Sequence, residues 1–326
     1  MAVYTKLSIE EISNITKHYK LGNLETYQGI EEGIENTNYL LVTSNEKYIL
    51  TIFEKRVNEK DIPFFVNVMK YLNRNSFFCP NPIEDMNGNL INEIKKKKYI
   101  VVNFLDGKGK IKPTTKDCIS LGKTLADMHN KTKNFTEIRN NSLSIDGWER
   151  LYKKICKDIS KVELNKLDKL LLFDMEERLN FCYENWPKNL PKGFIHGDIF
   201  PDNVFFKNND ICGIIDFYFS CTDFLIYEIA IALNAWCFDN EKKFNFEKAQ
   251  SLVKGYNSKK KITIKELKAI SILSQGASLR FLLTRLYDWF NTPKEAILNK
   301  KNPLEYLNKL RFFRDNNFEN ELLKGD

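Results

Sequence analysis

Long apolar runs are missing from the 326-residue sequence. No stretch reaches eighteen consecutive apolar residues, which excludes an ordinary membrane-spanning helix. The N-terminus has no apolar core of the kind that signal peptides carry, so we do not expect export. The sequence therefore predicts a protein without a membrane partner.

Paired cysteines are also missing. The seven cysteines are scattered along the chain, and no two of them form a CxxC pair. An odd count without paired spacing argues against a structural zinc site. We therefore predict reduced thiols and a cytoplasmic location.

The sequence also lacks a concentrated basic segment. The net charge is +7, but much of it lies in two short lysine runs at residues 95–98 and 259–261, and 43 acidic residues are interspersed. No basic helix and no platform of aromatic and basic residues accompanies the charge. The sequence argues against a nucleic-acid partner, and the phosphates of a nucleotide are the anions that we expect instead.

The first hundred residues have the pattern of a small β-rich unit. Hydrophobic residues make up 43% of the chain, enough for buried cores, and short β-forming runs alternate with turns that contain Gly or Asn. This alternation is typical of an antiparallel meander. We expect strands at residues 24–27, 38–42, 48–53 and 99–105, and a helix at residues 61–72.

Farther along the chain the apolar residues recur at a period close to 3.6, which indicates helices. We expect helices at residues 115–129 and 164–186, and short strands at residues 193–196, 204–206 and 211–216. The order predicts an α+β fold with two lobes. A small β-rich N-terminal lobe spans residues 1–106, a larger helix-rich lobe spans residues 107–326, and the active site lies in the cleft between them.

One segment carries recognisable chemistry. It reads His196-Gly-Asp198-Ile-Phe-Pro-Asp-Asn203, and Asp216 follows at the end of an apolar strand. This is the spacing of a kinase catalytic loop, in which phosphoryl transfer needs a base for the attacking hydroxyl and ligands for magnesium. We predict Asp198 as the base, and Asn203 and Asp216 as ligands of Mg²⁺, which prefers hard oxygen donors. The alternative is a purely structural role, in which His196 and Asp198 form a hydrogen-bonded turn and Asp216 caps the end of a strand.

The remaining polar residues of the catalytic segment have secondary roles in this interpretation. His196 is a catalytic candidate that braces the loop by side-chain hydrogen bonds, and direct proton transfer is the alternative. Asp202 is expected to cap the following turn, with a place near the metal as the alternative.

Two segments of the first lobe are candidates for binding ATP. Gly29 and Gly33 lie in a connection between strands, where backbone N–H groups could hold phosphates, although an ordinary hairpin is the alternative. The strand that ends near Asn103 and Leu105 precedes the joint between the lobes. An adenine ring would find backbone N–H and C=O groups there.

At this point the sequence resembles a known family. His-Gly-Asp-Ile-Phe-Pro-Asp-Asn-Val-Phe-Phe at residues 196–206 and Ile-Ile-Asp-Phe-Tyr-Phe at residues 214–219 resemble the aminoglycoside-phosphotransferase-like branch of the protein-kinase fold. Residues 232–238 and 279–289 are most similar to the bacterial homoserine kinases of that branch. The resemblance extends over nearly the whole chain. It implies transfer of the ATP γ-phosphate to the side-chain hydroxyl of L-homoserine, and it implies the roles given above for Asp198, Asn203 and Asp216.

The sequence departs from the broad kinase pattern at the phosphate clamp. Thr51 stands where the third strand usually carries a lysine or arginine, and Lys55 lies on the same face by period-two alternation. The glutamate that usually pairs with that cation is missing from the following helix, where Phe64 and Phe65 occupy its region. Lys55 is therefore our candidate for the ATP phosphates.

A homoserine site needs a cation for the carboxylate and an anion or carbonyl for the ammonium. Arg280 and Arg285 lie in an apolar helical run, and a guanidinium binds carboxylates with two hydrogen bonds. Five positions on a helix turn through roughly 500°, so the two arginines point about 140° apart and do not share one role. Either could instead pair with Asp288 or Glu228. Asp223 is the candidate for the ammonium group, with a helix N-cap as its alternative.

Other functions stay open. A kinase of the same branch acting on choline, ethanolamine, a sugar or an aminoglycoside is the nearest alternative, and an inactive kinase-like scaffold is a more distant one. A choline site needs an aromatic cage, and an aminoglycoside site needs a dense acidic patch. Few acidic residues follow Asp216, which argues against an aminoglycoside. The oligomeric state is left open.

Overall fold

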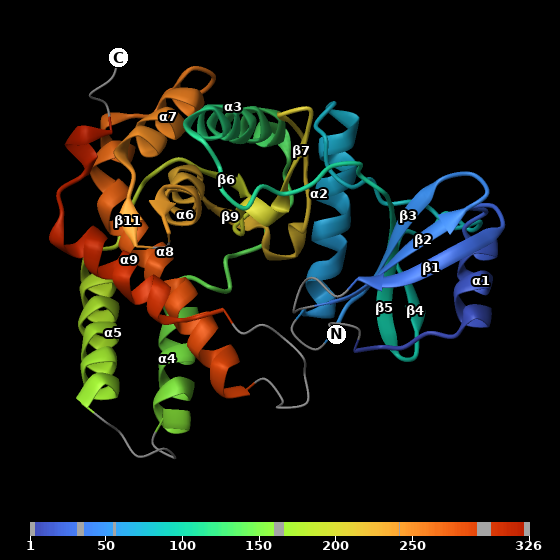
Figure 1. Ribbon diagram of the computed structural model, residues 1–326, viewed down its shortest axis with the longest axis horizontal. Coiled ribbons are helices and arrows are strands. Elements are labelled where there is room, and N and C mark those ends of the chain that lie inside the picture. The colour runs from blue at the N-terminus through green and yellow to red at the C-terminus, as the bar shows by residue number, and fades with distance from the viewer. Residues whose placement is uncertain are drawn as a thin grey trace.

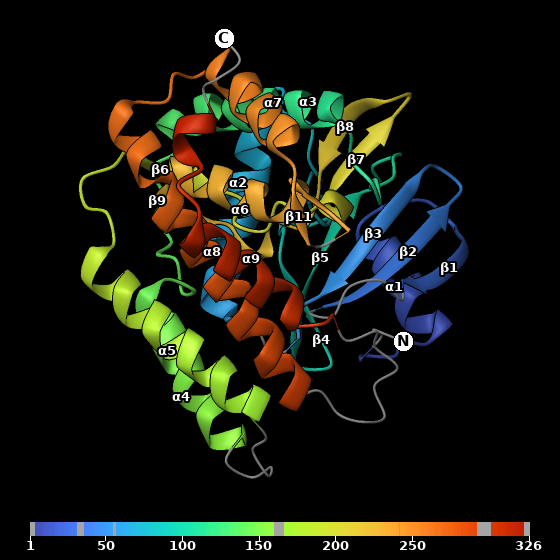
Figure 2. The ribbon, with the colours of Figure 1, turned by 60° about the vertical axis from the view of Figure 1, so that its left-hand side comes forward.

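The computed structural model describes residues 4–30, 36–54, 57–159, 166–240, 242–291 and 301–322. Two of the predicted site residues, Gly33 and Lys55, lie outside these ranges. Figures 1 and 2 show a small lobe built on one sheet and a larger lobe built mostly of helices.

The small lobe is an antiparallel sheet flanked by helices, as the alternating pattern predicted. Its five strands lie in the order β1-β2-β3-β5-β4, and every neighbouring pair is antiparallel. The helix α1 begins with a reciprocal cap between Ser8 and Glu11. The elements are α1 (Ile9–His18), β1 (Leu24–Ile30), β2 (Thr37–Thr43), β3 (Lys47–Ile52), α2 (Ile62–Arg74), β4 (Asn92–Ile94) and β5 (Lys97–Asn103).

The strand β5 divides its side chains between two hydrophobic clusters, because successive residues of a strand point to opposite faces of a sheet. Tyr99 and Val101 join a cluster with α1. Ile100 and Val102 join the larger cluster that holds the buried side of α2 and the core of the large lobe. Figure 1 shows α2 standing between the sheet and the helices of the large lobe. The boundary at residue 106 stays a prediction, since the large core extends across it.

The large lobe contains the predicted helices and short strands. Strands β6 and β9 lie against the buried helix α6, and β8 lies against α3. Strand β6 pairs with β9, and β7 pairs with β8. The elements are α3 (Thr115–Lys131), α4 (Ile145–Ile159), α5 (Lys166–Asn185), β6 (Lys192–Ile195), β7 (Val204–Lys207), β8 (Asp210–Ile214), β9 (Cys221–Phe224), α6 (Leu225–Trp236), β10 (Phe238–Asp239), β11 (Lys243–Phe244), α7 (Phe246–Asn257), α8 (Ile264–Asn291) and α9 (Leu304–Asp315).

Short 3₁₀ turns complete the fold, and two of them flank the predicted catalytic residues. These two are η3 (Pro201–Asn203) and η4 (Phe217–Phe219). The others are η1 (Glu59–Asp61), η2 (Thr132–Asn134) and η5 (Glu319–Glu321). In the described ranges no helix is both long and apolar enough to span a membrane. All seven cysteines are free thiols.

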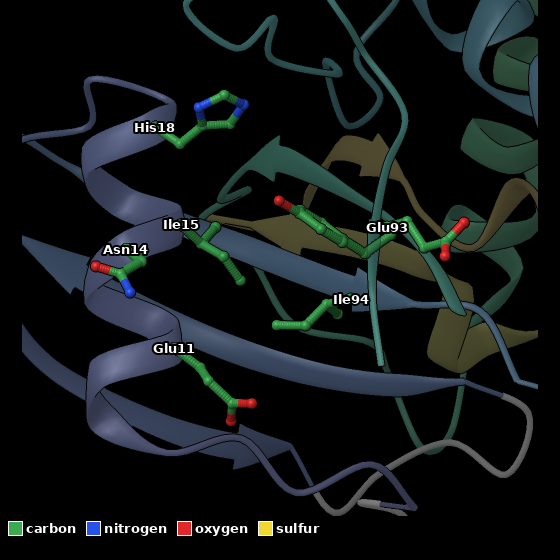
Figure 3. A pocket seen from close by; sticks show the side chains of 7 residues that line it. Glu11, Asn14, Ile15, His18, Glu93 and Ile94 are labelled. Atoms are coloured by element: carbon green, nitrogen blue, oxygen red, sulfur yellow. The ribbon is translucent and has the colours of Figure 1, made fainter. Parts of the chain in front are cut away.

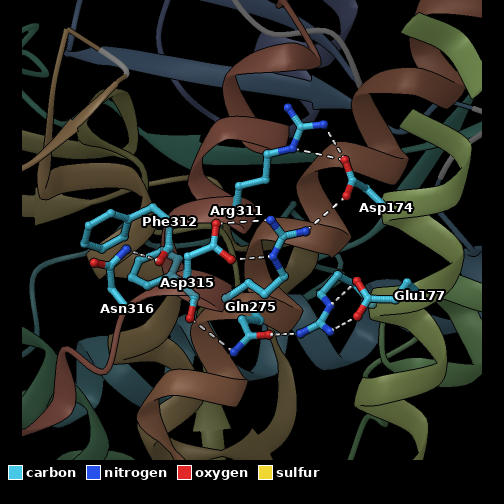
Figure 4. A network of polar contacts seen from close by, with 10 residues as sticks. Asp174, Glu177, Gln275, Arg311, Phe312, Asp315 and Asn316 are labelled. Carbon is cyan, nitrogen blue, oxygen red and sulfur yellow. Dashed lines mark hydrogen bonds and ion pairs between the residues drawn. The ribbon is translucent and has the colours of Figure 1, made fainter. Parts of the chain in front are cut away.

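A polar network ties α9 to α5 and α8 (Figure 4). Asp174 of α5 accepts hydrogen bonds from Arg311 and Arg314 of α9. Gln275 of α8 accepts a hydrogen bond from Arg178 of α5 and donates one to the carbonyl of Phe313 in α9. Because α4 and α5 pack side by side against α8, the network joins α9 to a group of three packed helices.

A hollow on the small lobe lies between α1 and the strands β4 and β5 (Figure 3). Its lining includes Glu11 and Asn14 of α1 and Glu93 of β4, and it contains none of the residues predicted to bind ATP or to perform catalysis. At one end His18 pairs with Asp85 at 2.8 Å, and Asp85 also accepts hydrogen bonds from the turn at residues 87–89. These contacts hold the turn against α1.

Candidate active site

The loop after β6 is shaped by a glycine. Gly197 has φ +77, a conformation that L side chains rarely adopt, and a Cβ there would lie 3.0 Å from the carbonyl oxygen of Phe219. The tight turn places His196 and Asp198 on either side of Gly197. A side chain at residue 197 would therefore force the catalytic segment away from η4.

His196 is fully buried and both of its ring nitrogens are occupied. Its Nε2 donates to the carbonyl of Ile215 at 2.8 Å, and its Nδ1 accepts from the backbone N–H of Asp198 at 3.3 Å. Burial lowers the pKa of the imidazole, which favours the neutral ring. The ring thus links the loop at Asp198 to the residue before Asp216, and neither nitrogen is available to a substrate proton.

Asp198 and Asn203 are brought together by the turn η3. The side-chain Nδ2 of Asn203 donates to the carbonyl oxygen of Asp198 at 2.8 Å and to its Oδ2 at 3.2 Å. Burial raises the pKa of Asp198, opposed by the charges of Arg280 and Lys301. The amide of Asn203 therefore fixes the orientation of the Asp198 carboxyl group, and it keeps its own oxygen for another partner.

Asp216 follows β8 in a left-handed backbone conformation, with φ 65 and ψ 62. This conformation is strained for a residue with a side chain, and such strain is common at functional sites. Burial and the neighbouring charges of Asp198 and Asp202 raise the pKa of Asp216 to about 7. Three carboxyl groups therefore repel one another here, and a cation would relieve that repulsion.

Side chains of α6 and α8 hold the backbone of the catalytic loop by hydrogen bonds. The buried carboxylate of Glu228 accepts the backbone N–H groups of His196 and Gly197. Arg280 is 3% exposed and donates through Nη1 to the carbonyl of Gly197, while its Nε has no partner among the described residues. Trp236 donates to the carbonyl of Ile199 at 2.8 Å. The loop backbone is thus held at residues 196, 197 and 199.

The two predicted substrate arginines diverge, as their spacing on the helix indicated. Arg280 points to the catalytic loop, whereas Arg285 forms an ion pair with Glu305 of α9 and donates to the carbonyl of Asn302 at 3.1 Å. Its guanidinium also lies 4.4 Å from the ring centre of Tyr306. Arg285 therefore joins α8 to α9, although its partner is Glu305 rather than Asp288 or Glu228.

Asp223 lies at the end of β9, and its carboxylate has two local partners. It accepts from the side chain of Asn141 at 2.8 Å and from the backbone N–H of Phe224 at 2.7 Å. The N-cap of α6 is Phe224, so the alternative prediction of Asp223 as N-cap is wrong.

An aromatic cluster occupies the place of the usual clamp between the third strand and the following helix. Thr51 is buried and donates to the side-chain oxygen of Asn38 at 2.7 Å. The ring of Tyr218, two residues after Asp216, meets the rings of Phe53 and Phe65 at 5.0 and 6.0 Å, and its hydroxyl donates to Thr51 at 3.4 Å. The segment after β8 therefore contacts the small lobe through uncharged groups.

The predicted nucleotide residues that the structure describes lie along the sheet. Gly29 pairs with Tyr39 near the end of β1. Asn103 ends β5, and its side-chain oxygen accepts the backbone N–H of Asn81 at 2.6 Å. Leu105 follows in the connection to the large lobe, and no backbone hydrogen bond to it is present within the described ranges.

Known proteins with similar sequences identify the family of this chain. A sequence profile of the phosphotransferase enzyme family matches residues 26–256. The chain belongs to this family. A homoserine kinase of Agrobacterium fabrum (strain C58) is 43% identical to the chain over 314 residues, which cover 96% of this chain and 96% of that protein. The resemblance predicted from the sequence is confirmed.

Solved structures show the same fold as this phosphotransferase. A spectinomycin phosphotransferase in complex with ADP and spectinomycin matches with a TM-score of 0.66 and 15% identity, over 98% of this chain and 99% of that one. An amicoumacin kinase in complex with AMP-PNP, Ca²⁺ and Ami matches with a TM-score of 0.66 and 15% identity, over 96% of this chain and 94% of that one. The predicted two-lobed, protein-kinase-like fold is confirmed.

Three residues around the catalytic loop of this phosphotransferase were not assigned there from the sequence. Glu228 is a single carboxylate in an otherwise apolar helix, a pattern that signals a buried charge with a dedicated partner. Trp236 carries an indole N–H that needs an acceptor when buried. Lys301, whose Nζ lies 3.6 Å from Asp202, has no such signal in a lysine-rich chain.

Proposed function

We propose that the chain is a homoserine kinase that transfers the γ-phosphoryl group of ATP to the side-chain hydroxyl of L-homoserine. The observation that carries the proposal is the 43% identity to a homoserine kinase over 96% of both proteins. The catalytic loop supports the reaction class, because Asp198 lies where Asn203 fixes its carboxyl group. We infer a small-molecule acceptor from the same similarity to a homoserine kinase. A cytoplasmic location stays a prediction.

The reaction transfers one proton and one phosphoryl group. The carboxylate of Asp198 accepts the proton of the acceptor hydroxyl, whose oxygen forms a bond to the γ-phosphorus. The bond from that phosphorus to the β–γ bridging oxygen breaks, and ADP leaves with the electron pair. Because the side chain of Asn203 donates to Asp198, it aims the carboxylate before the hydroxyl arrives.

Asn203 and Asp216 fit a magnesium ion. The amide nitrogen of Asn203 is used by Asp198, which leaves its oxygen for a metal. Asp216 offers a carboxylate in a place where two neighbouring carboxylates favour a cation. Mg²⁺ takes one or two such ligands and completes its shell with water and substrate phosphates. When bound, the ion would supply positive charge against the ATP phosphates.

The proposed ATP site extends from the sheet to the connection between the lobes. We propose that the backbone groups at Leu105, two residues after Asn103, bind the edge of an adenine ring. Gly29 lies at the start of a connection whose backbone N–H groups are proposed to hold phosphates, and Gly33 and Lys55 stay predictions for the same role outside the described residues.

Arg280 is the proposed ligand of the homoserine carboxylate, and Asp223 that of its ammonium group. Arg280 is buried beside the catalytic loop and has an unpartnered Nε, which is a costly arrangement unless a ligand satisfies it. Arg285 is already neutralised by Glu305. We therefore assign the carboxylate to Arg280 alone.

Replacing Arg280 with alanine should remove the preference for an acceptor that has a carboxylate. We expect the ratio of kcat/KM for L-homoserine to that for 3-aminopropan-1-ol, which lacks only the carboxylate, to fall by about 10- to 100-fold. Loss of the hydrogen bond to Gly197 affects both acceptors, so it cancels in the ratio. Arg285→Ala should leave the ratio unchanged. An unchanged ratio in Arg280→Ala would remove this arginine from the substrate site.

The proposed function is tested by an acceptor panel. Purified protein with ATP and Mg²⁺ is given L-homoserine, ethanolamine, choline, a hexose and an aminoglycoside, and release of ADP is measured. We expect the highest kcat/KM with L-homoserine. A clear preference for ethanolamine or choline would establish the other small-alcohol kinase instead, and no turnover with any acceptor would favour an inactive scaffold.

A further inference from the structure

We propose that Lys301 is the cation that contacts the transferred phosphoryl group, a role that the third strand leaves vacant at Thr51. The inference rests on the proposed phosphotransfer reaction. It assigns a function to a residue shortly before α9, which no sequence motif marks.

The third strand offers a neutral group where kinases place a cation. Thr51 is 2% exposed, its hydroxyl is committed to Asn38, and Tyr218 covers it from the side of Asp216. Phosphoryl transfer spreads negative charge over three equatorial oxygens, and a positioned cation stabilises that charge. The charge requirement at the phosphoryl group is not met at residue 51.

Lys301 lies in the large lobe shortly before α9, and its side chain reaches the catalytic loop of the same lobe. Its Nζ lies 3.6 Å from the carboxylate of Asp202 and 5.2 Å from the ring centre of Phe200, both within the catalytic segment. A separation of 3.6 Å is longer than a hydrogen bond, so Asp202 attracts the ammonium by charge without accepting one of its N–H groups. The side chain is 55% exposed, and a ligand at the loop could approach it.

The backbone that carries Lys301 is held in place. Arg285 donates to the carbonyl of Asn302, the next residue, and pairs with Glu305 in the first turn of α9. The network of Asp174 with Arg311 and Arg314 anchors the same helix to α5 (Figure 4). The fixed backbone limits the range of the Lys301 ammonium to the reach of its flexible four-carbon stem.

The place of Lys301 suits the phosphoryl group because Asp198, the proposed base, lies in the same loop between His196 and Phe200. In the transfer, the acceptor oxygen bonds to phosphorus as the bond to the β–γ bridging oxygen breaks, and Asp198 takes the proton. Lys301 keeps its proton throughout and contributes only positive charge to a phosphoryl oxygen. Arg285, which anchors Asn302, is then a positioning residue.

Nucleotide binding tests the contact without any acceptor. Calorimetry with Mg²⁺ should show that Lys301→Ala weakens binding of AMP-PNP by about tenfold and changes that of ADP by less than about twofold, because only AMP-PNP has a γ-phosphoryl group. Lys265→Ala, an exposed lysine near the start of α8, is the matched control and should change neither. Equal weakening of both nucleotides, or no weakening, would overturn the proposal.

Kinetic measurements distinguish a contact of Lys301 with the phosphoryl group from a contact with the homoserine carboxylate. We expect Lys301→Ala to lower kcat by about 100-fold with both L-homoserine and 3-aminopropan-1-ol, and Lys301→Arg to recover most of the loss. A loss confined to L-homoserine would assign Lys301 to the carboxylate and reject the proposal. If the wild-type protein prefers another alcohol, the acceptor assignment fails while the nucleotide comparison still decides the role of Lys301.

Discussion

Replacing Asp198 with asparagine should lower kcat by roughly 10²- to 10⁴-fold while nucleotide binding is retained. Asparagine has nearly the same shape and can still accept the hydrogen bond from Asn203, so the loop keeps its structure. It has no basic oxygen to take the proton of the acceptor hydroxyl. The measurement is kcat with saturating L-homoserine and ATP, together with the Kd of AMP-PNP.

Asp210→Asn is the matched control for this change. Asp210 is an exposed carboxylate at the start of β8, in the hairpin that follows the catalytic loop, and its replacement should leave kcat within about twofold. If Asp198→Asn kept more than a tenth of the wild-type kcat, Asp198 would not be the base. His196 could not take its place, since both ring nitrogens are already hydrogen-bonded.

The proximity of the three proposed catalytic residues could be predicted because they occupy a short span of the sequence. Asp198 and Asn203 are five positions apart, and a single turn, η3, brings them into hydrogen-bond contact. Asp216 follows one hairpin later, at the end of β8. Local turns and one antiparallel pair are sufficient to assemble these three residues, so spacing alone carries the information.

The supports of the loop could not be predicted because they come from distant parts of the chain. Glu228 holds backbone groups 31 and 32 positions earlier, and Arg280 bonds to Gly197 across 83 positions. The sequence offered Asp288 and Glu228 as partners of Arg285, but tertiary packing brought α9 alongside α8 and supplied Glu305. Such pairings depend on how helices pack, and helical periodicity does not specify it.

The phosphate clamp could be predicted from the sequence only in part. The sequence showed that Thr51 replaces the usual cation, and the structure gives the physical reason why a cation is unsuited there. Residue 51 is buried, and the rings of Phe53, Phe65 and Tyr218 gather beside it. An ammonium at that position would lose its water without gaining an anion in the protein. The missing charge must then come from outside the third strand.

Magnesium binding should weaken as the pH falls below 7, because protonation of Asp216 would remove a proposed ligand of the metal. The metal binds the ionised carboxylate, and in the metal-free protein the pKa of Asp216 is raised to about 7 by burial and by Asp198 and Asp202. Above that pH the carboxylate is already ionised, so the apparent affinity should be level. Below it, protons compete with the metal, and the affinity should fall by up to about tenfold per pH unit.

The pH profile is measured by calorimetric titration of Mg²⁺ into the protein with AMP-PNP between pH 5.5 and 8.5, and Asp216→Asn provides its control. The phosphates of the nucleotide also take up protons as the pH falls, and they do so equally in the variant. We expect Asp216→Asn to bind Mg²⁺ at least about tenfold more weakly at pH 8 and to retain only the shallow dependence due to the nucleotide. A variant with the wild-type affinity and the wild-type slope would show that the metal is held without Asp216, and the left-handed strain at this residue would then need another explanation.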